Sequence, residues 1–226
     1  MKTLFTIFFL TALVLLLSCN TGKPKDIIAE SFDFAAQQLL YAIDLTDEVI
    51  ANDSRDSLVK VNRPLVSPKT VKEDGSLAMV PASDWTSGFF PGELWFMYEY
   101  TKDPEWEELA VRFTSPLESQ KLNKGTHDLG FMIYNSFGNG LRLSGKSNYS
   151  DIIMDAARSL ASRYKPAAKI IRSWDHNRDK WQCPVIIDNM MNLELLFWAF
   201  KESGDSAFYN IAVNHANTAM KNHFRD

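Results

Sequence analysis

Hydrophobic positions recur at helical spacing along most of the chain and group into pairs of helix-like runs. The first run of each pair is predominantly apolar and covers residues 88–100, 130–143 and 190–201. The second run carries charged residues on one side and covers residues 105–120, 149–164 and 208–222. A helix that is apolar on most sides is typical of an inner position, and a helix with one polar side is typical of an outer one. The pattern therefore predicts three helical hairpins in which the inner helix comes first.

Other segments show weaker patterns. Residues 27–50 carry apolar positions at helical spacing and predict one further helix. Residues 51–84 are rich in Asp, Ser, Pro and Lys without a sustained period, which predicts a long loop folded over a site. Lys169–Ser173 and Pro184–Ile187 are short β-prone pieces, and we expect both to be extended.

A short motif opens each inner run. The motifs read W-T-S-G-F-F-P-G from Trp85, H-D-L-G-F from His127 and I-D-N-M-M-N from Ile187. A polar turn follows each motif at a nearly constant separation along the sequence. The motif residue and the turn residue are Thr86 and Thr101, Asp128 and Ser144, and Asp188 and Ser203. Hairpins that recur in this way are typical of helical repeats and toroids. The repeat should bring Trp85, Asp128 and Asp188 to the same end of the molecule.

Two interpretations remain open for Asp128 and Asp188. An aspartate at a helix N-terminus usually caps the helix, because its carboxylate accepts hydrogen bonds from free backbone N–H groups. Alternatively, two facing carboxylates that share a buried site hold a proton between them, which is what glycoside chemistry requires. Companions that capping does not need favour the second interpretation: His127 beside Asp128, and Asn189 and Asn192 after Asp188.

Tryptophan and histidine residues supply the remaining candidates. Trp85, Trp174 and Trp181 lie in predicted loops, where they stack on a sugar ring or pack against the ends of helices. Three others lie on apolar helical faces and are expected in the core: Trp95, Trp106 and Trp198. His215 falls inside an amphipathic run, where a lone histidine is more often structural. No metal-binding spacing or phosphate-binding glycine loop occurs, so we expect no cofactor and no metal.

Composition and the N-terminus narrow the class of protein. The sequence has 24 Lys and Arg against 28 Asp and Glu, a net charge of −4, so there is no basic field for nucleic acid. Residues 1–18 resemble a lipoprotein signal peptide ending in L-L-S before Cys19, the expected lipidation site. We expect residues 19–25 to be a lipid-anchored tether and residues 26–226 the folded part. An ordinary secretory signal or a single membrane anchor is the alternative.

Together the motifs that begin at Asp84, His127 and Val185 resemble the unsaturated glucuronyl hydrolases of glycoside hydrolase family 88. The resemblance runs from about Phe32 to the end of the chain. It implies an all-α fold, an (α/α)6 toroid of which about the first half to two-thirds is present. It also implies removal of the 4,5-unsaturated uronic acid that polysaccharide lyases leave on oligosaccharides, by hydration of a vinyl ether.

The resemblance also assigns roles. Asp188 is similar to the general acid/base of the family and Asp128 to its second essential carboxylate. His127, Trp85 and His215 match positions that line the uronate pocket, and Trp174 and Trp181 remain candidates for sugar stacking.

Two alternatives stay open. An unsaturated rhamnogalacturonyl hydrolase shares the toroid and the chemistry, and a non-catalytic glycan-binding lipoprotein would need only the anchor and the loop tryptophans. Members of the family are nearly twice as long as this chain, so we expect the 226-residue polypeptide alone to be poorly folded and weakly active or inactive. We expect a location in the bacterial cell envelope, on the periplasmic side rather than the cell surface.

Overall fold

The computed structural model describes residues 26–53 and 64–224. The chain divides into two compact units, residues 1–38 and residues 39–226. Helix α2 (Ile27–Asp53) contributes to both units and confirms the helix predicted over residues 27–50. Among the described residues, none of the helices combines the length and the apolar character needed to cross a membrane. All candidate site residues that the structure describes belong to the second unit.

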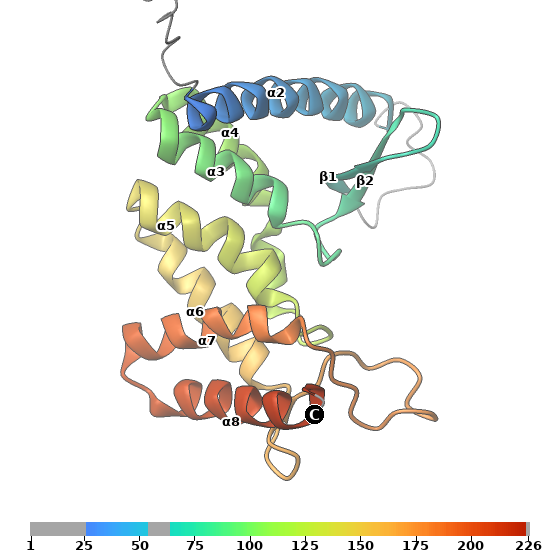
Figure 1. The fold of residues 1–226 in the computed structure, drawn as a ribbon, viewed down its shortest axis with the longest axis vertical. Helices are drawn as coiled ribbons and strands as arrows, with labels where there is room; N and C mark the ends of the chain where they lie inside the picture. Colours follow the sequence, from blue (N-terminus) through green and yellow to red (C-terminus); the bar gives the residue numbers. More distant parts are fainter. Residues whose placement is uncertain (1–25, 54–63, 225–226) are drawn as a thin grey trace, which may run out of the picture. The chain divides into compact units, whose positions relative to one another are not determined.

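Three helical hairpins make up most of the second unit, as the hydrophobic pattern predicted (Figure 1). In each hairpin the two helices pack against each other. The inner elements are α3 (Phe89–Thr101), the π-helix η2 (Gly130–Gly138) with its continuation α5 (Asn139–Ser144), and α7 (Asn189–Ser203). The outer elements are α4 (Pro104–Thr114), α6 (Asn148–Ala161) and α8 (Ser206–His223), and a 3-10 helix, η1 (Ser115–Leu122), follows α4.

Aspartate caps mark the starts of two outer helices, and glycines in the left-handed backbone conformation mark the ends of two inner elements. The side chains of Asp103 and Asp205 accept hydrogen bonds from backbone N–H groups at the starts of α4 and α8, at 3.0 and 2.9 Å. The inner elements α5 and α7 end at Gly145 and Gly204, whose φ angles of 67° and 72° suit glycine. These signals explain why the hairpin boundaries could be predicted closely.

Inner elements pack at close range where glycine replaces a larger side chain. A Cβ on Gly88 would lie 2.7 Å from the Cα of Met132, so α3 and η2 meet backbone against backbone. A Cβ on Gly130 would lie 2.7 Å from the Cα of Asn192, which brings the start of η2 against α7. These contacts hold the motif-bearing starts of the three inner elements together.

The core contains two of the three tryptophans expected there. Trp95 is fully buried and its Nε1 donates a hydrogen bond to the Oγ1 of Thr114 at 3.0 Å, and Trp106 is also buried. The prediction for Trp198 is only partly right, because its side chain is half-buried beside Tyr134, with the ring centroids 6.4 Å apart.

Two predictions for the connecting segments need correction. Residues 51–84 are not one long loop, since β1 (Leu65–Val71) and β2 (Leu77–Pro81) pair as an antiparallel hairpin. The pairing includes two register irregularities, which disrupts the alternation that marks a regular strand. Residues 54–63 lie outside the described part of the chain.

The second correction concerns the segment before α7. Ile170–Ile171 forms the short strand β4, which pairs with β3 (Tyr164–Lys165). Pro184–Ile187 forms no strand, although the Pro184 carbonyl accepts a hydrogen bond from the backbone N–H of Ser173 at 2.9 Å. A single backbone hydrogen bond holds Pro184–Ile187 beside Ser173 but does not form the series of paired bonds that defines a β-strand.

Candidate active site

The candidate site lies where the inner elements η2 and α7 begin. His127 and Asp128 immediately precede η2, and Asp188 immediately precedes α7. One atom from each of these three side chains lies within 4.8 Å of the others. The repeat therefore brings the two aspartates to one place, as the spacing of the motifs predicted.

His127 is the centre of this cluster. Its ring is almost completely buried, with Nδ1 2.8 Å from the carbonyl oxygen of Ser173. Because a carbonyl only accepts hydrogen bonds, Nδ1 carries a proton. Nε2 faces the opposite way and lies 3.2 Å from an oxygen of Asp128 and 3.2 Å from an oxygen of Asp188.

A hydrogen bond between Nε2 of His127 and a carboxyl oxygen requires a proton on one of the two groups. Either Nε2 of His127 carries a second proton and donates it to the carboxylates, or Nε2 accepts a proton from a protonated carboxyl of Asp128 or Asp188. In both cases a proton is held next to a partner that can accept it. Such a pair is what general acid–base chemistry requires.

The two carboxylates differ in exposure. The side chain of Asp128 is 15% exposed, and its Oδ2 accepts a hydrogen bond from the hydroxyl of Thr126. The side chain of Asp188 is 40% exposed. Asp188 is therefore the carboxyl group that a bound molecule reaches more easily.

Capping does not account for Asp188. It occupies the N-cap position of α7, yet its side chain accepts no hydrogen bond from the helix N-terminus. This differs from Asp205 of α8, whose carboxylate does cap its helix. The carboxylate of Asp188 instead faces His127.

Two asparagines that follow Asp188 fix the surrounding backbone. Asn192 is buried and its Oδ1 accepts a hydrogen bond from the backbone N–H of Phe131 at 2.9 Å. Asn189 is also buried and donates from Nδ2 to the carbonyl oxygen of Ile171 at 3.0 Å. These bonds join α7 to η2 and to β4, so the spacing between Asp128 and Asp188 depends on side chains beside them.

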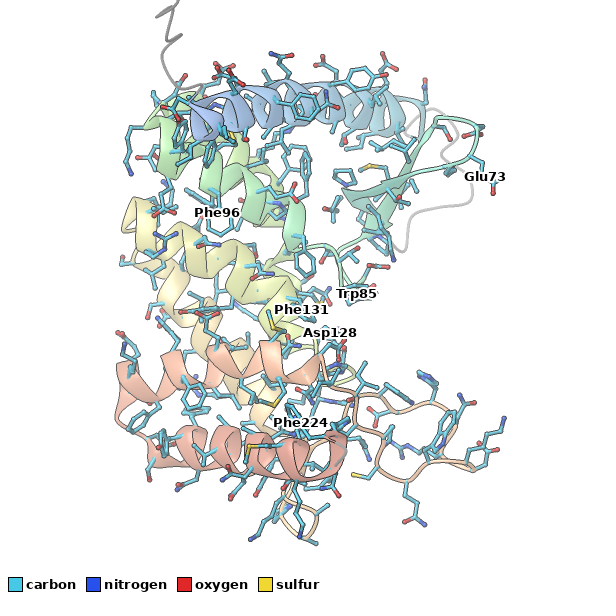
Figure 2. All side chains as sticks on the ribbon, viewed as in Figure 1. Glu73, Trp85, Phe96, Asp128, Phe131 and Phe224 are labelled. Carbon is cyan, nitrogen blue, oxygen red and sulfur yellow. The ribbon has the colours of Figure 1, made fainter. Side chains whose placement is uncertain are left out.

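Aromatic residues form a partly exposed surface at the same end of the inner helices. Figure 2 shows Trp85, Asp128 and Phe131 at the starts of α3 and η2. The ring of Trp85 is half-exposed and its centroid lies 6.0 Å from those of both Phe89 and Phe131. Such a surface suits the apolar face of a sugar ring.

The hairpin holds the segment that carries Trp85. Lys69 of β1 forms an ion pair with Asp84 at 3.1 Å, and its Nζ lies 5.8 Å from the centroid of the Trp85 ring. Partial burial acts to raise the pKa of Asp84, but hydrogen bonds from Thr86 and Lys69 outweigh it and leave that pKa below its usual value. The charged carboxylate of Asp84 thus joins β1 to the turn that carries Trp85.

Trp174 and Trp181 lie in the loop between β4 and α7. The ring of Trp174 stacks on His176 at 5.4 Å and meets the edge of Trp181 at 6.4 Å, and Trp181 is half-exposed. Trp174 follows Ser173, whose carbonyl contacts His127, so this loop is tied to the cluster by its backbone. A role for either ring in sugar stacking stays a prediction.

His215 is placed differently from the other candidates. Its side chain is completely buried in α8, and its Nδ1 accepts a hydrogen bond from the backbone N–H of Ile171 at 2.9 Å. Burial, with smaller contributions from His127 and His223, lowers the pKa of His215 to about 4, so the ring is neutral at physiological pH. The observed contact supports β4; a contact with substrate stays a prediction.

Sequence reasoning missed two neighbours of the cluster. Thr126 adjoins the His127 motif and could have been found from that position, because a hydroxyl two residues before an aspartate often bonds to it. Ser173 contributes its backbone carbonyl, which no side-chain pattern announces. Cys19, the predicted lipidation site, lies outside the described residues.

The cluster also has the donor set for a small cation. His127, Asp128 and Asp188 each offer one nitrogen or oxygen ligand atom at compatible distances. The same short distances allow a proton to pass between these side chains, and the hydrogen bond from Nδ1 to Ser173 keeps the ring of His127 oriented for that transfer.

Comparison with known proteins identifies relatives that share these segments. No protein-family model matches the chain. A curated protein of Formosa agariphila, named unsaturated glucuronyl hydrolase, is 54% identical over 147 residues, which cover 65% of this chain and 37% of the relative. The chain is a homologue of the unsaturated glucuronyl hydrolases.

More distant relatives agree with this assignment. An unsaturated chondroitin disaccharide hydrolase of Streptococcus pneumoniae is 30% identical over 162 residues, which cover 70% of this chain and 41% of the relative. The crystal structure of an unsaturated glucuronyl hydrolase specific for heparin matches with a TM-score of 0.69 and 42% identity, covering 81% of this chain and 48% of that one. The predicted toroid of helical hairpins is thereby confirmed as the fold to which this part belongs. The chain spans less than half the length of each of these relatives.

Proposed function

We propose that the protein to which this chain belongs removes a 4,5-unsaturated uronic acid from the non-reducing end of oligosaccharides produced by a polysaccharide lyase. The observation that carries the proposal is the position of His127, whose Nε2 lies 3.2 Å from both Asp128 and Asp188. Homology to unsaturated glucuronyl hydrolases supports the same reaction.

Hydration of the vinyl ether fits this arrangement. The protonated carboxyl of Asp188 donates its proton to C4 of the unsaturated ring, which leaves positive charge at C5 shared with the ring oxygen. Water adds at C5 while the Asp188 carboxylate takes its proton, so the carboxyl is regenerated. The resulting hemiketal opens by cleavage of the bond between C5 and the ring oxygen, which leaves a ketone at C5 and a hemiacetal at C1. The hemiacetal then breaks down to an aldehyde at C1 and releases the remaining sugar with a free hydroxyl group.

The other two residues support this proton transfer. Asp128 is the less exposed carboxylate, and its negative charge stabilises the positive charge that develops on the sugar. His127 lies between the carboxylates, and its Nδ1–H bond to Ser173 keeps Nε2 directed at both. Trp85 supplies a partly exposed ring next to Phe131 on which the sugar stacks.

Glycosaminoglycan fragments are the proposed substrate class. The names of the relatives refer to chondroitin disaccharides and heparin, which supports this class over rhamnogalacturonan. A purely glycan-binding role is less well supported, because it would not require His127, Asp128 and Asp188 to lie so close together.

Ultraviolet absorbance of the substrate double bond tests the proposal. The chain should be assayed beside a form extended through any downstream coding sequence, on unsaturated disaccharides from chondroitin, heparin and rhamnogalacturonan. We expect the absorbance of a chondroitin or heparin disaccharide to fall with the extended form. Turnover of the rhamnogalacturonan disaccharide alone would select that alternative, and sugar binding without turnover would select the binding role.

We also propose that the mature protein is anchored to the cell envelope through a lipid on Cys19, facing the periplasm. The apolar run before L-L-S-Cys19 supports this. Incorporation of labelled fatty acid that is lost in Cys19→Ala would support the anchor, and equal labelling of both would contradict it. Resistance of the anchored protein to protease added to whole cells distinguishes the periplasmic side from the cell surface.

A further inference from the structure

Arg163, in the turn between α6 and β3, is a buried cation outside the cluster described above. Its side chain is almost fully enclosed, at 2% exposure. Burying a guanidinium costs free energy unless its N–H groups find partners. The groups that Arg163 contacts therefore show what the buried charge organises.

These partners lie on two separate segments. Nε of Arg163 donates to the carbonyl oxygen of Arg172 at 2.8 Å, and Nη1 donates to the carbonyl oxygen of Lys124 and to Oδ2 of Asp175 at 2.9 Å. The backbone N–H of Arg172 returns a hydrogen bond to the carbonyl of Arg163 at 3.2 Å. The planar guanidinium suits such a fork of several acceptors, which an ammonium group cannot match.

Both segments lead directly to the hydrogen bond that orients His127. Lys124 lies three residues before His127, and Arg172 immediately precedes Ser173, whose carbonyl accepts from Nδ1 of His127 at 2.8 Å. The guanidinium of Arg163 thus holds the backbone before His127, which donates this hydrogen bond, and the backbone before Ser173, which accepts it. Asp175, which also pairs with Arg172 and Arg178, supplies the carboxylate that the buried guanidinium contacts.

We infer that Arg163 is a positioning residue for the active site, which acts by holding the Ser173 carbonyl against His127 and so keeps the proton on Nδ1. The link to a reaction rests on the proposed function, whereas the state of His127 can be measured without turnover. Orientation of an imidazole through its second nitrogen is a general device of catalytic sites.

Helix α6, which precedes the turn that carries Arg163, offers a matched control. Arg158 of α6 is exposed and forms an ion pair with Asp155 at 2.9 Å, one turn away on the same helix. Arg158→Lys makes the same chemical change as Arg163→Lys without touching the segments around His127. Trp95 provides an internal check on the fold, because its buried Nε1–H donates to the Oγ1 of Thr114 at 3.0 Å, away from the segments that Arg163 contacts.

The experiment is nitrogen-15 and proton NMR of the histidine and tryptophan rings, in a folded form of the protein that contains these residues, for the wild type, Arg163→Lys and Arg158→Lys. Substitution of each histidine assigns the signals. In the wild type and Arg158→Lys, we expect a slowly exchanging Nδ1–H proton on His127 over a neutral to alkaline pH series. In Arg163→Lys, we expect loss of that signal while the Nε1–H signal of Trp95 persists.

Three results would overturn the inference. An unchanged Nδ1–H signal of His127 in Arg163→Lys would show that the guanidinium does not orient the ring. Loss of the His127 signal and of the Trp95 Nε1–H signal together would show that Arg163 supports the fold as a whole. Equal loss in Arg158→Lys would show an effect of the helix and not of these contacts. Each readout is independent of turnover, so failure of the proposed function would be seen separately.

Discussion

Nε2 of His127 lies 3.2 Å from Oδ1 of Asp188, although 61 residues separate them in the chain. The contact exists because His127 precedes one inner helix and Asp188 precedes the next, and these elements pack side by side. Asp128 approaches the same nitrogen at 3.2 Å. A single imidazole therefore connects the two carboxylates on which the proposed chemistry depends.

Replacement of His127 tests this connection. His127→Gln retains a polar side chain but cannot contact Ser173 and both carboxylates with the geometry of the ring. We expect kcat/KM on an unsaturated disaccharide to fall by roughly 10²- to 10⁴-fold. His223→Gln, at the end of α8, is the control and should retain activity. Near wild-type turnover by His127→Gln would contradict the role assigned to the ring.

Two helix-initial aspartates should separate catalysis from stability. Asp205 caps α8, so Asp205→Ala should lower the free energy of unfolding by about 1 kcal/mol and leave turnover unchanged. Asp188 accepts no capping bond, so Asp188→Ala should abolish turnover and change the free energy of unfolding by less than about 0.5 kcal/mol. Urea unfolding and turnover assays on both variants check this. The opposite distribution of effects would make Asp188 a structural residue.

Gly130 should be intolerant of a side chain. A Cβ there would lie 2.7 Å from both the Cα and the Oδ1 of Asn192, so Gly130→Ala should push η2 away from α7. We expect a loss of about 1–3 kcal/mol in the free energy of unfolding, together with reduced turnover as Asp128 moves relative to Asp188. Gly125→Ala is the control, because its Cβ would approach only the side chain of Asn123, at 3.2 Å. Equal stability of the two variants would contradict this packing.

His215 predicts a pH dependence of stability. Its pKa falls from 6.5 to about 4 on folding, so between these values the unfolded chain binds a proton that the folded protein does not. Stability therefore decreases as the pH falls through this window, by about 2 kcal/mol between pH 7 and pH 5. Urea unfolding at the two pH values measures the change.

The matched variant is His215→Gln, whose amide oxygen can still accept from the backbone N–H of Ile171. We expect the pH-dependent loss of stability in this window to be about 2 kcal/mol smaller than in the wild type. The same slope in both proteins would assign the effect to other groups.

Local sequence signals determined much of the fold. The hairpins could be predicted because apolar periodicity, aspartate caps such as Asp103 and glycines such as Gly204 all indicate the same boundaries. The β1–β2 hairpin was missed because Pro68 and the irregular register remove the alternation of a regular strand. Its position depends on contacts distant in sequence, among them the ion pair between Lys69 and Asp84.

The site was predictable where side chains form motifs and not where backbone groups act. Asp128 and Asp188 share one phase of the repeat, so their proximity follows from the spacing. The carbonyl of Ser173 has no signature in the sequence, and Arg163 lies in the turn after an outer helix and belongs to none of the motifs. Both act through tertiary hydrogen bonds that periodicity cannot reveal.

Cleavage of an unsaturated chondroitin disaccharide in deuterium oxide follows the fate of the substrate double bond, in the extended form with the wild-type sequence and with Asp188→Asn. We expect the wild-type sequence to remove the ultraviolet absorbance and deliver one deuterium to C4 of the released uronic acid, and we expect Asp188→Asn to do neither. Release of a uronic acid with its double bond intact, or normal turnover by Asp188→Asn, would contradict the proposed mechanism.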